Sequence, residues 1–161
     1  MKVSENVQAA SLGSDYSGAI TKDGTLYMWG KNSEVGDGTW EDCNSPVKVL
    51  ENVQTVSLKS NYSGAVTKDG VLYMWGGNFA GKLGDGTSEN RNSLVKVLES
   101  VQSISLVGNH SGAVTKEGTL YMWGYDTKIG KNIYYGSWSR PRRVKLKKGR
   151  KTGQASYSIV G

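Results

Sequence analysis

The side chains that most often carry out chemistry are scarce in this sequence of 161 residues. Cys43 is the single cysteine and His110 the single histidine. A zinc site needs several Cys or His ligands, and a nucleophilic triad needs a base beside its nucleophile. We therefore expect no catalytic residue, no metal site, no cofactor and no enzymatic activity. We interpret Cys43 as an incidental loop thiol and His110 as a packing residue.

Two aspartates, Asp37 and Asp85, each lie between two glycines, as in some calcium-binding or phosphate-binding loops. Calcium takes about six to eight oxygen ligands, and neither loop has the carboxylate spacing of a calcium-binding hand. The sequence also lacks a phosphate-binding loop that ends in Gly-Lys-Ser or Gly-Lys-Thr. We interpret both aspartates as parts of turns that glycine permits.

Positive charge is concentrated near the C-terminal end. The chain carries 20 basic and 14 acidic residues, and eight of the basic ones lie between Arg140 and Lys151, which leaves 12 basic residues elsewhere. Such a block could bind nucleic acid or another polyanion. No aromatic residues are interleaved for stacking on bases, so we favour an exposed basic segment. The block comprises Arg140, Arg142, Arg143, Lys145, Lys147, Lys148, Arg150 and Lys151.

The elements that must position these residues come from an internal repeat. The segment Tyr62–Gly76 is repeated with small changes at Tyr16–Gly30 and at His110–Gly124. Trp29, Trp75 and Trp123 are separated by 46 and 48 residues, which predicts an array of like units. We divide the chain into three repeats and a basic, polar tail, with boundaries at 5–50, 51–98, 99–146 and 147–161.

Each repeat reads as four short strands, which in the second copy cover 53–58, 64–67, 71–75 and 94–98. An Asp-Gly turn at Asp69 and Gly70 predicts a tight hairpin between the second and third strands. The third strand is bulky on both sides, which is typical of a strand between stacked layers. We therefore predict an all-β fold of three four-stranded antiparallel propeller blades, forming a partial or open propeller.

The connection before the last strand varies most between copies, as a binding face on a constant scaffold would. It covers 31–40, 77–92 and 125–138 in the three repeats. Aromatic residues dominate binding hot spots, so we predict that those in these loops contact a protein partner. The candidates are Trp40, Phe79, Tyr134, Tyr135 and Trp138.

The motifs have a family likeness. Tyr73-Met74-Trp75-Gly76 after Asp-Gly, the run from Gly77 to Thr87, and the strand 101–106 before Gly108-Asn-His-Ser resemble repeats of the regulator of chromosome condensation family, and bacterial members in particular. This resemblance implies a β-propeller, usually of seven blades, that binds other proteins as a scaffold. Family members include an exchange factor for a small GTPase, so a guanine-nucleotide exchange regulator is the alternative function. Carbohydrate adhesion through Tyr and Trp is a third possibility.

Three repeats are fewer than half of a seven-bladed ring, and an open arc leaves strand edges and apolar faces uncovered. Either the sequence is a piece of a longer protein, which a start at Lys2 inside a repeat favours, or copies associate to close a ring. No apolar run approaches the roughly 18 residues of a membrane span, and no signal peptide is evident. We therefore expect no membrane association and, by default, a cytoplasmic protein.

Overall fold

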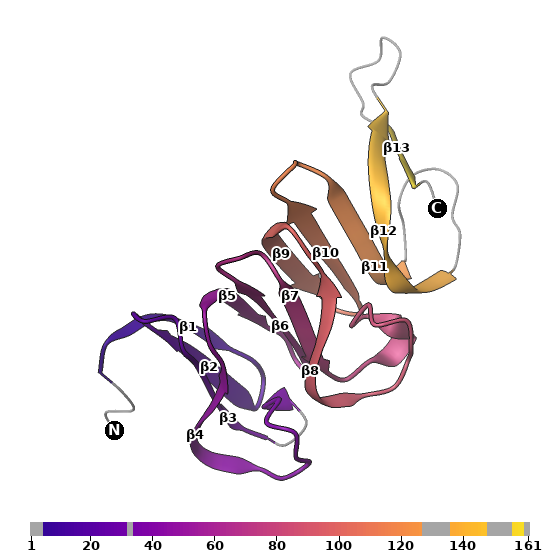
Figure 1. Cartoon of the computed structure of the whole chain (residues 1–161). Coiled ribbons are helices and arrows are strands. Elements are labelled where there is room, and N and C mark those ends of the chain that lie inside the picture. The colour runs from indigo at the N-terminus through magenta and orange to yellow at the C-terminus, as the bar shows by residue number, and fades with distance from the viewer. Residues whose placement is uncertain (1–4, 32–33, 127–135, 148–155, 160–161) are drawn as a thin grey trace.

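Antiparallel strands make up nearly all of the regular structure. The computed structural model describes residues 5–31, 34–126, 136–147 and 156–159. The strands and the 3-10 turn η2 follow one another along the chain (Figure 1). Their bounds are β1 Val7–Leu12, β2 Tyr16–Thr21, β3 Leu26–Gly30, β4 Cys43–Leu50, β5 Val53–Leu58, β6 Tyr62–Thr67, β7 Leu72–Gly76, η2 Phe79–Gly81, β8 Arg91–Leu98, β9 Val101–Val107, β10 His110–Thr115, β11 Leu120–Asp126, β12 Gly136–Lys147 and β13 Ser156–Ile159.

The strands form three sheets, each a meander in chain order. We call them blade 1 (β1 to β4), blade 2 (β5 to β8) and blade 3 (β9 to β13). They stand side by side with their strands similarly directed (Figure 1). The predicted all-β fold of antiparallel propeller blades in an open arc is confirmed. Blade 3 gains a fifth strand, because β13 pairs with β12 from Val144↔Ile159 to Lys147↔Ser156.

The blades repeat the same register, which follows from the repeated sequence. Tyr16 pairs with Gly30 in blade 1, Tyr62 with Gly76 in blade 2 and His110 with Gly124 in blade 3. The β6–β7 turn closes at Gly70, whose φ of +91° is open to glycine at little cost. The Gly70 N–H donates to the Thr67 carbonyl at 2.9 Å. The Asp-Gly signal therefore marks the hairpin as predicted.

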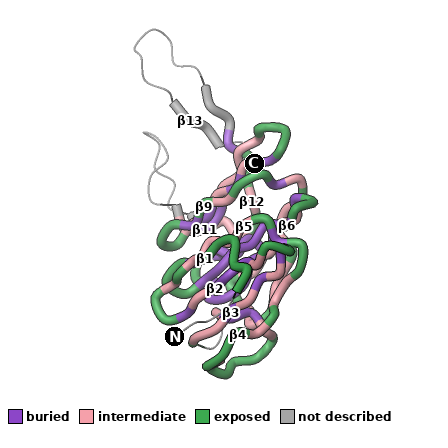
Figure 2. Tube along the Cα trace, turned by 90° about the vertical axis from the view of Figure 1, so that its left-hand side faces the viewer, coloured by how far each residue is buried: buried purple, intermediate pink, exposed green. Residues whose placement is uncertain are grey.

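Two apolar cores of the same design lie between the blades. The first joins Ile20, Leu26 and Met28 of blade 1 to Ala65 and Trp75 of blade 2. The second repeats this arrangement between blades 2 and 3, with Leu72 and Met74 on one side and Ala113 and Trp123 on the other. Strand β7 therefore contributes to both cores, which explains its lack of polar alternation. Buried residues concentrate in the middle strands, and the connections are exposed (Figure 2).

Tyrosine hydroxyls link each blade to the next across these cores. The Tyr16 hydroxyl donates to the carbonyls of Lys59 at 2.6 Å and Tyr62 at 2.9 Å, and it accepts from the Ser63 hydroxyl at 2.9 Å. One blade later, the Tyr62 hydroxyl donates to the His110 carbonyl at 2.8 Å. The repeat position held by Tyr16 and Tyr62 thus links one blade to the next. His110 occupies the equivalent position in blade 3.

Burial raises the pKa of Tyr16 to about 12, and burial also raises the pKa of Tyr62. Above pH 10 the unfolded phenols ionise while the buried ones stay neutral. Their contribution to stability is therefore complete below pH 10 and is lost as the pH rises toward about 12. We expect Tyr16→Phe to lower the free energy of unfolding at pH 7 by about 1–3 kcal/mol, because it leaves buried polar groups unpaired. The variant should also lose less of its free energy of unfolding than the wild type does between pH 10 and about 12.

Urea denaturation between pH 7 and pH 12 measures both effects. Tyr27→Phe is the matched control, since it makes the same change in a half-buried tyrosine of β3 in the same blade. Equal alkaline losses in the wild type and in Tyr16→Phe would contradict the assignment.

Candidate interaction surface

The long connections of blades 1 and 2 project from the same side of the arc, and that of blade 2 lies next to the start of β12 (Figure 1). This placement follows from the hairpin register, because β3 and β7 both end at that side. We define the rim surface as residues 34–42, 77–90 and 137–143. The three stretches carry the described members of the predicted site.

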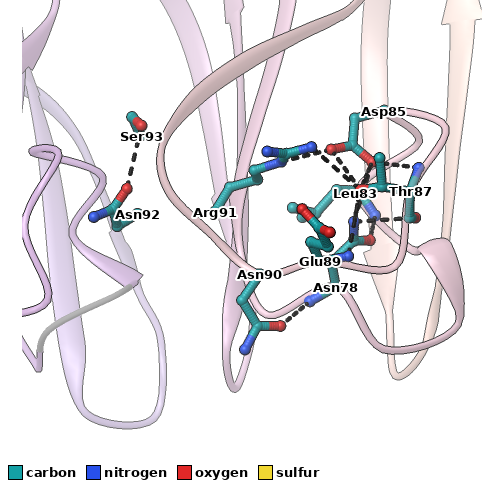
Figure 3. A network of polar contacts seen from close by, with 9 residues as sticks. All are labelled: Asn78, Leu83, Asp85, Thr87, Glu89, Asn90, Arg91, Asn92 and Ser93. Atoms are coloured by element: carbon teal, nitrogen blue, oxygen red, sulfur yellow. Dashed lines mark hydrogen bonds and ion pairs between the residues drawn. The ribbon is translucent and has the colours of Figure 1, made fainter.

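Blade 2 holds its rim loop through Asn78, which is fully buried. Its Nδ2 donates to Asp85 Oδ1 at 3.1 Å and to the Thr87 carbonyl at 3.2 Å, and its Oδ1 accepts from the Leu83 N–H at 2.9 Å. The Asn78 N–H donates to Asn90 Oδ1 at 2.8 Å (Figure 3). Asn78 therefore holds the middle of the loop with its side chain and the end of the loop with its N–H.

The Asp85 carboxylate is the second group, after Asn78, that joins several parts of this loop by hydrogen bonds (Figure 3). Arg91 Nε donates to Asp85 Oδ2 at 2.7 Å, and the Thr87 N–H donates to Oδ1 at 2.9 Å. Burial alone would raise the pKa of Asp85, but the Thr87 N–H and the Arg91 guanidinium outweigh it and keep that pKa below its usual value. The aspartate is thus fully used within the protein, in agreement with its interpretation as a turn residue.

Blade 1 uses the same device with a thiol in place of the guanidinium. The Thr39 N–H donates to Asp37 Oδ1 at 2.9 Å, and Cys43 Sγ donates to Oδ2 at 3.2 Å. Burial and the Asp37 carboxylate both raise the pKa of the Cys43 thiol. A nucleophilic cysteine needs the opposite shift, so this environment suits a structural thiol.

Each rim loop is also held by the following blade. Trp75 Nε1 donates to the Glu34 carbonyl at 2.8 Å, and Trp123 Nε1 donates to the Lys82 carbonyl at 2.9 Å. The Gly86 N–H donates to the Ser139 carbonyl at 2.6 Å, as Gly38 does to Asn92 at 2.8 Å. The loops are therefore rigid parts of the blade interfaces.

Exposed aromatic side chains lie on this rigid base. Phe79 is 67% exposed at the start of η2, and Trp40 is 54% exposed after the blade 1 turn. Trp138 is half-buried, with the Arg142 guanidinium carbon 5.2 Å from the centre of its ring. Tyr134 and Tyr135 lie outside the described residues. The assignment of these five residues to a partner site stays a prediction.

The basic block begins inside blade 3. Arg140, Arg142, Arg143, Lys145 and Lys147 belong to β12, and the first three are exposed. A Cβ placed on Gly86 would lie 2.6 Å from the Arg140 guanidinium, so this side chain packs over the rim loop of blade 2. Lys148, Arg150 and Lys151 lie outside the described residues. Part of the predicted tail, residues 156–159, forms β13.

One buried residue of the rim loop was missed at the level of the sequence. Lys82 is only 2% exposed, its Nζ donates to Asn61 Oδ1 at 2.8 Å and lies 4.6 Å from the centre of the Tyr62 ring. Burial lowers the pKa of this lysine. Its signal was the recurrence of a charged residue, an aliphatic residue and glycine at 34–36 and 82–84.

Other kinds of site find little support in the described part of the chain. No group of three or more His, Cys, Asp or Glu residues there could hold a metal ion. Cys43 lies in blade 1 and His110 in blade 3. Among the same residues, none of the helical segments has the length and apolar character for crossing a bilayer.

The fold and the rim loops define a propeller of a known repeat type. Residues 69–114 match the model of the "Regulator of chromosome condensation (RCC1) repeat", a span from the β6–β7 turn into β10. This match confirms the predicted resemblance to the regulator of chromosome condensation family, and the likeness to bacterial members in particular stays a prediction. No curated protein sequence matches the chain.

Solved structures show the same fold. Human WBSCR16 is 22% identical with a TM-score of 0.76, and the match covers 92% of this chain and 44% of WBSCR16. Prp20p from Saccharomyces cerevisiae, described with its binding properties to Gsp1p and histones, is 20% identical with a TM-score of 0.72, covering 91% and 39%. Yeast RCC1 (Prp20) bound to Kap60 is 22% identical with a TM-score of 0.71, and the match covers 96% of this chain and 42% of the yeast protein. The chain thus spans less than half the length of each.

Proposed function

We propose that this protein is a non-enzymatic binding module that holds another protein on its rim surface. The observation that carries the proposal is the pairing of exposed Phe79 with a loop whose polar groups are satisfied internally. A large exposed aromatic residue on a rigid loop loses little conformational freedom on binding, so most of its contact energy becomes affinity. Trp40 extends the same surface onto blade 1.

The similar yeast propeller supports a protein as the partner, since its described ligands are Gsp1p, histones and Kap60. The basic residues on β12 would favour an acidic region of such a partner. Double-stranded nucleic acid would use the same charges but offers no unstacked base to Phe79. The binding of a polyanion alone would weaken steeply with added salt.

Affinity measurements with alanine variants test the proposal. Proteins captured on the immobilised chain would be identified by mass spectrometry, and the dissociation constant measured for the tightest one. We expect Phe79→Ala and Trp40→Ala each to weaken binding by about tenfold or more, which is about 1.4 kcal/mol, with unchanged thermal stability. Lys22→Ala, in the exposed β2–β3 turn at the opposite end of blade 1, is the control. Unchanged affinity in both rim variants would overturn the proposal.

A regulator of a small GTPase is the second candidate, favoured by the likeness to Prp20p and its described binding to Gsp1p. Gsp1p loaded with a fluorescent guanine nucleotide separates the two. Accelerated nucleotide release in the presence of the chain would select the exchange regulator. Binding without acceleration would agree with the non-enzymatic module.

A further inference from the structure

An exposed arginine lies close to Phe79 on the rim surface. The 3-10 turn η2, which begins at Phe79, lies against the start of β12 (Figure 1). A Cβ placed on Gly81 would lie 2.5 Å from the Ser139 Cα, so η2 packs directly on that residue. Arg140 follows Ser139 and is exposed. An exposed aromatic residue and an exposed guanidinium therefore belong to two segments in direct contact.

The rim loop of blade 2 holds Arg140 in place. The Gly86 N–H donates to the Ser139 carbonyl at 2.6 Å. A Cβ on Gly86 would lie 2.6 Å from Arg140 Nη2 and 2.7 Å from its Cζ, so the guanidinium rests on the face of this glycine. Asp85, the preceding residue, is already paired with Arg91 at 2.7 Å. In the described part of the chain, Arg140 is thus positioned but forms no ion pair.

The repeat shows that the fold requires neither the arginine nor the aromatic residue. At the equivalent junction of blades 1 and 2, the Gly38 N–H donates to the Asn92 carbonyl at 2.8 Å. The residue after Asn92 is Ser93, and the stretch 31–35 of blade 1 contains no aromatic residue. A Cβ on Gly38 would meet nothing within 4 Å. The same joint therefore forms without either group, so both are available for binding at the junction of blades 2 and 3.

Blade 3 also lacks an acidic residue that the other blades have. In blades 1 and 2, Lys48 and Lys96 of the outer strands form ion pairs with the glutamates three residues later. Arg143 holds the equivalent register position in β12, and three residues later the sequence has Leu146. Arg140 and Arg143 therefore give this strand positive charge that no described acidic residue pairs with.

We propose that the junction of blades 2 and 3 selects an acidic segment of the partner protein, in which an apolar side chain packs on Phe79 and a carboxylate pairs with Arg140. This assignment rests on the proposed protein-binding role of the rim surface and names the chemistry that the surface selects. A guanidinium can donate two parallel N–H bonds to one carboxylate, which gives geometric specificity as well as affinity. The aromatic contact beside it excludes water and strengthens the ion pair.

Selection from a random peptide library tests this specificity without a known partner. Short peptides displayed on phage would be selected on the immobilised full chain. We expect the enriched peptides to combine an aromatic or large aliphatic residue with a nearby Asp or Glu. Arg140→Ser introduces the residue that blade 2 has at this position, so the fold should be kept. It should weaken binding of the most enriched peptide by about fivefold, the upper end for an exposed ion pair.

Exchanging the two charges gives the sharpest outcome. Arg140→Glu should lose the acidic peptide and should bind a variant peptide in which lysine replaces the acidic residue. Lys116→Glu makes a matched charge reversal in the exposed β10–β11 turn, at the opposite end of blade 3, and should leave the affinity unchanged. The circular dichroism spectra of both variants should match that of the wild type.

The remaining outcomes separate this inference from the proposed function. Peptides that need Phe79 but carry no acidic residue, or that bind Arg140→Ser as well as the wild type, would overturn the inference and leave the proposed function standing. Acidic peptides without an apolar residue, or no enriched peptide at all, would also overturn it. Failure of the proposed function would show instead as partner binding that neither Phe79→Ala nor Trp40→Ala weakens.

Discussion

Trp123→Ala should lower the free energy of unfolding by about 3–5 kcal/mol. Trp123 is 1% exposed in the core between blades 2 and 3, and its indole N–H donates to the Lys82 carbonyl. Truncation opens a cavity and also removes the indole that holds the blade 2 rim loop through the Lys82 carbonyl. Urea denaturation followed by circular dichroism measures the loss.

Two variants separate the contributions of this residue. Trp123→Phe keeps most of the apolar contact but removes the donor. The Lys82 carbonyl still accepts from the Ser111 hydroxyl at 2.8 Å, so losing the indole bond should cost about 0.5–1.5 kcal/mol. Trp29→Ala makes the same truncation at the equivalent position of blade 1, where the side chain is half-buried, and should cost clearly less. Equal losses in Trp29→Ala and Trp123→Ala would mean that the contacts of Trp123 with the blade 2 rim loop add no stability.

Gly36→Ala is the second large effect, and Gly38→Ala is its matched control. Both glycines have a positive φ, +83° and +89°, so alanine costs about 1–2 kcal/mol of backbone strain at either position. At Gly36 the new methyl group would also lie 2.7 Å from Trp75 Nε1, whereas at Gly38 nothing lies within 4 Å.

The clash at position 36 should bring the loss in Gly36→Ala to about 2–5 kcal/mol, because the overpacking adds to the strain. Trp75 fluorescence should change with it, since the indole must move. If both alanine variants lost the same stability, backbone conformation alone would explain them, and the contact with Trp75 would carry no energy.

Strand positions were predictable because the repeat carries its signals three times. The second-copy strand predicted at 53–58 is β5, and those predicted at 64–67 and 71–75 differ from β6 and β7 by one or two residues at their ends. The last strand begins earlier than predicted, at Arg91, since Arg91 pairs with Gly76 beyond an irregularity in the register. Turn chemistry and aromatic strands were sufficient for these elements.

The rim loops were less predictable for a physical reason. Their conformation is held by hydrogen bonds to backbone carbonyls, such as that of Lys82. A carbonyl acceptor is present in every residue, so the sequence does not show which ones are used. The pairing of β13 with β12 was equally hidden, since Ser156–Ile159 is short and the sheets of blades 1 and 2 have no fifth strand. Exposure of Phe79 and Trp40 could be anticipated from their place in variable loops, but the rigidity beneath them could not.

The direction in which each loop is seated bears on how such a chain can grow by gene duplication. The rim loops of blades 1 and 2 each bond to the tryptophan of the unit that follows, Trp75 and Trp123. A unit inserted by unequal crossing-over therefore brings a tryptophan that bonds to the loop of the unit before it. It also brings a loop that can bond to the tryptophan of the unit after it. Such an array can lengthen by whole units without any compensating substitution at the new joints.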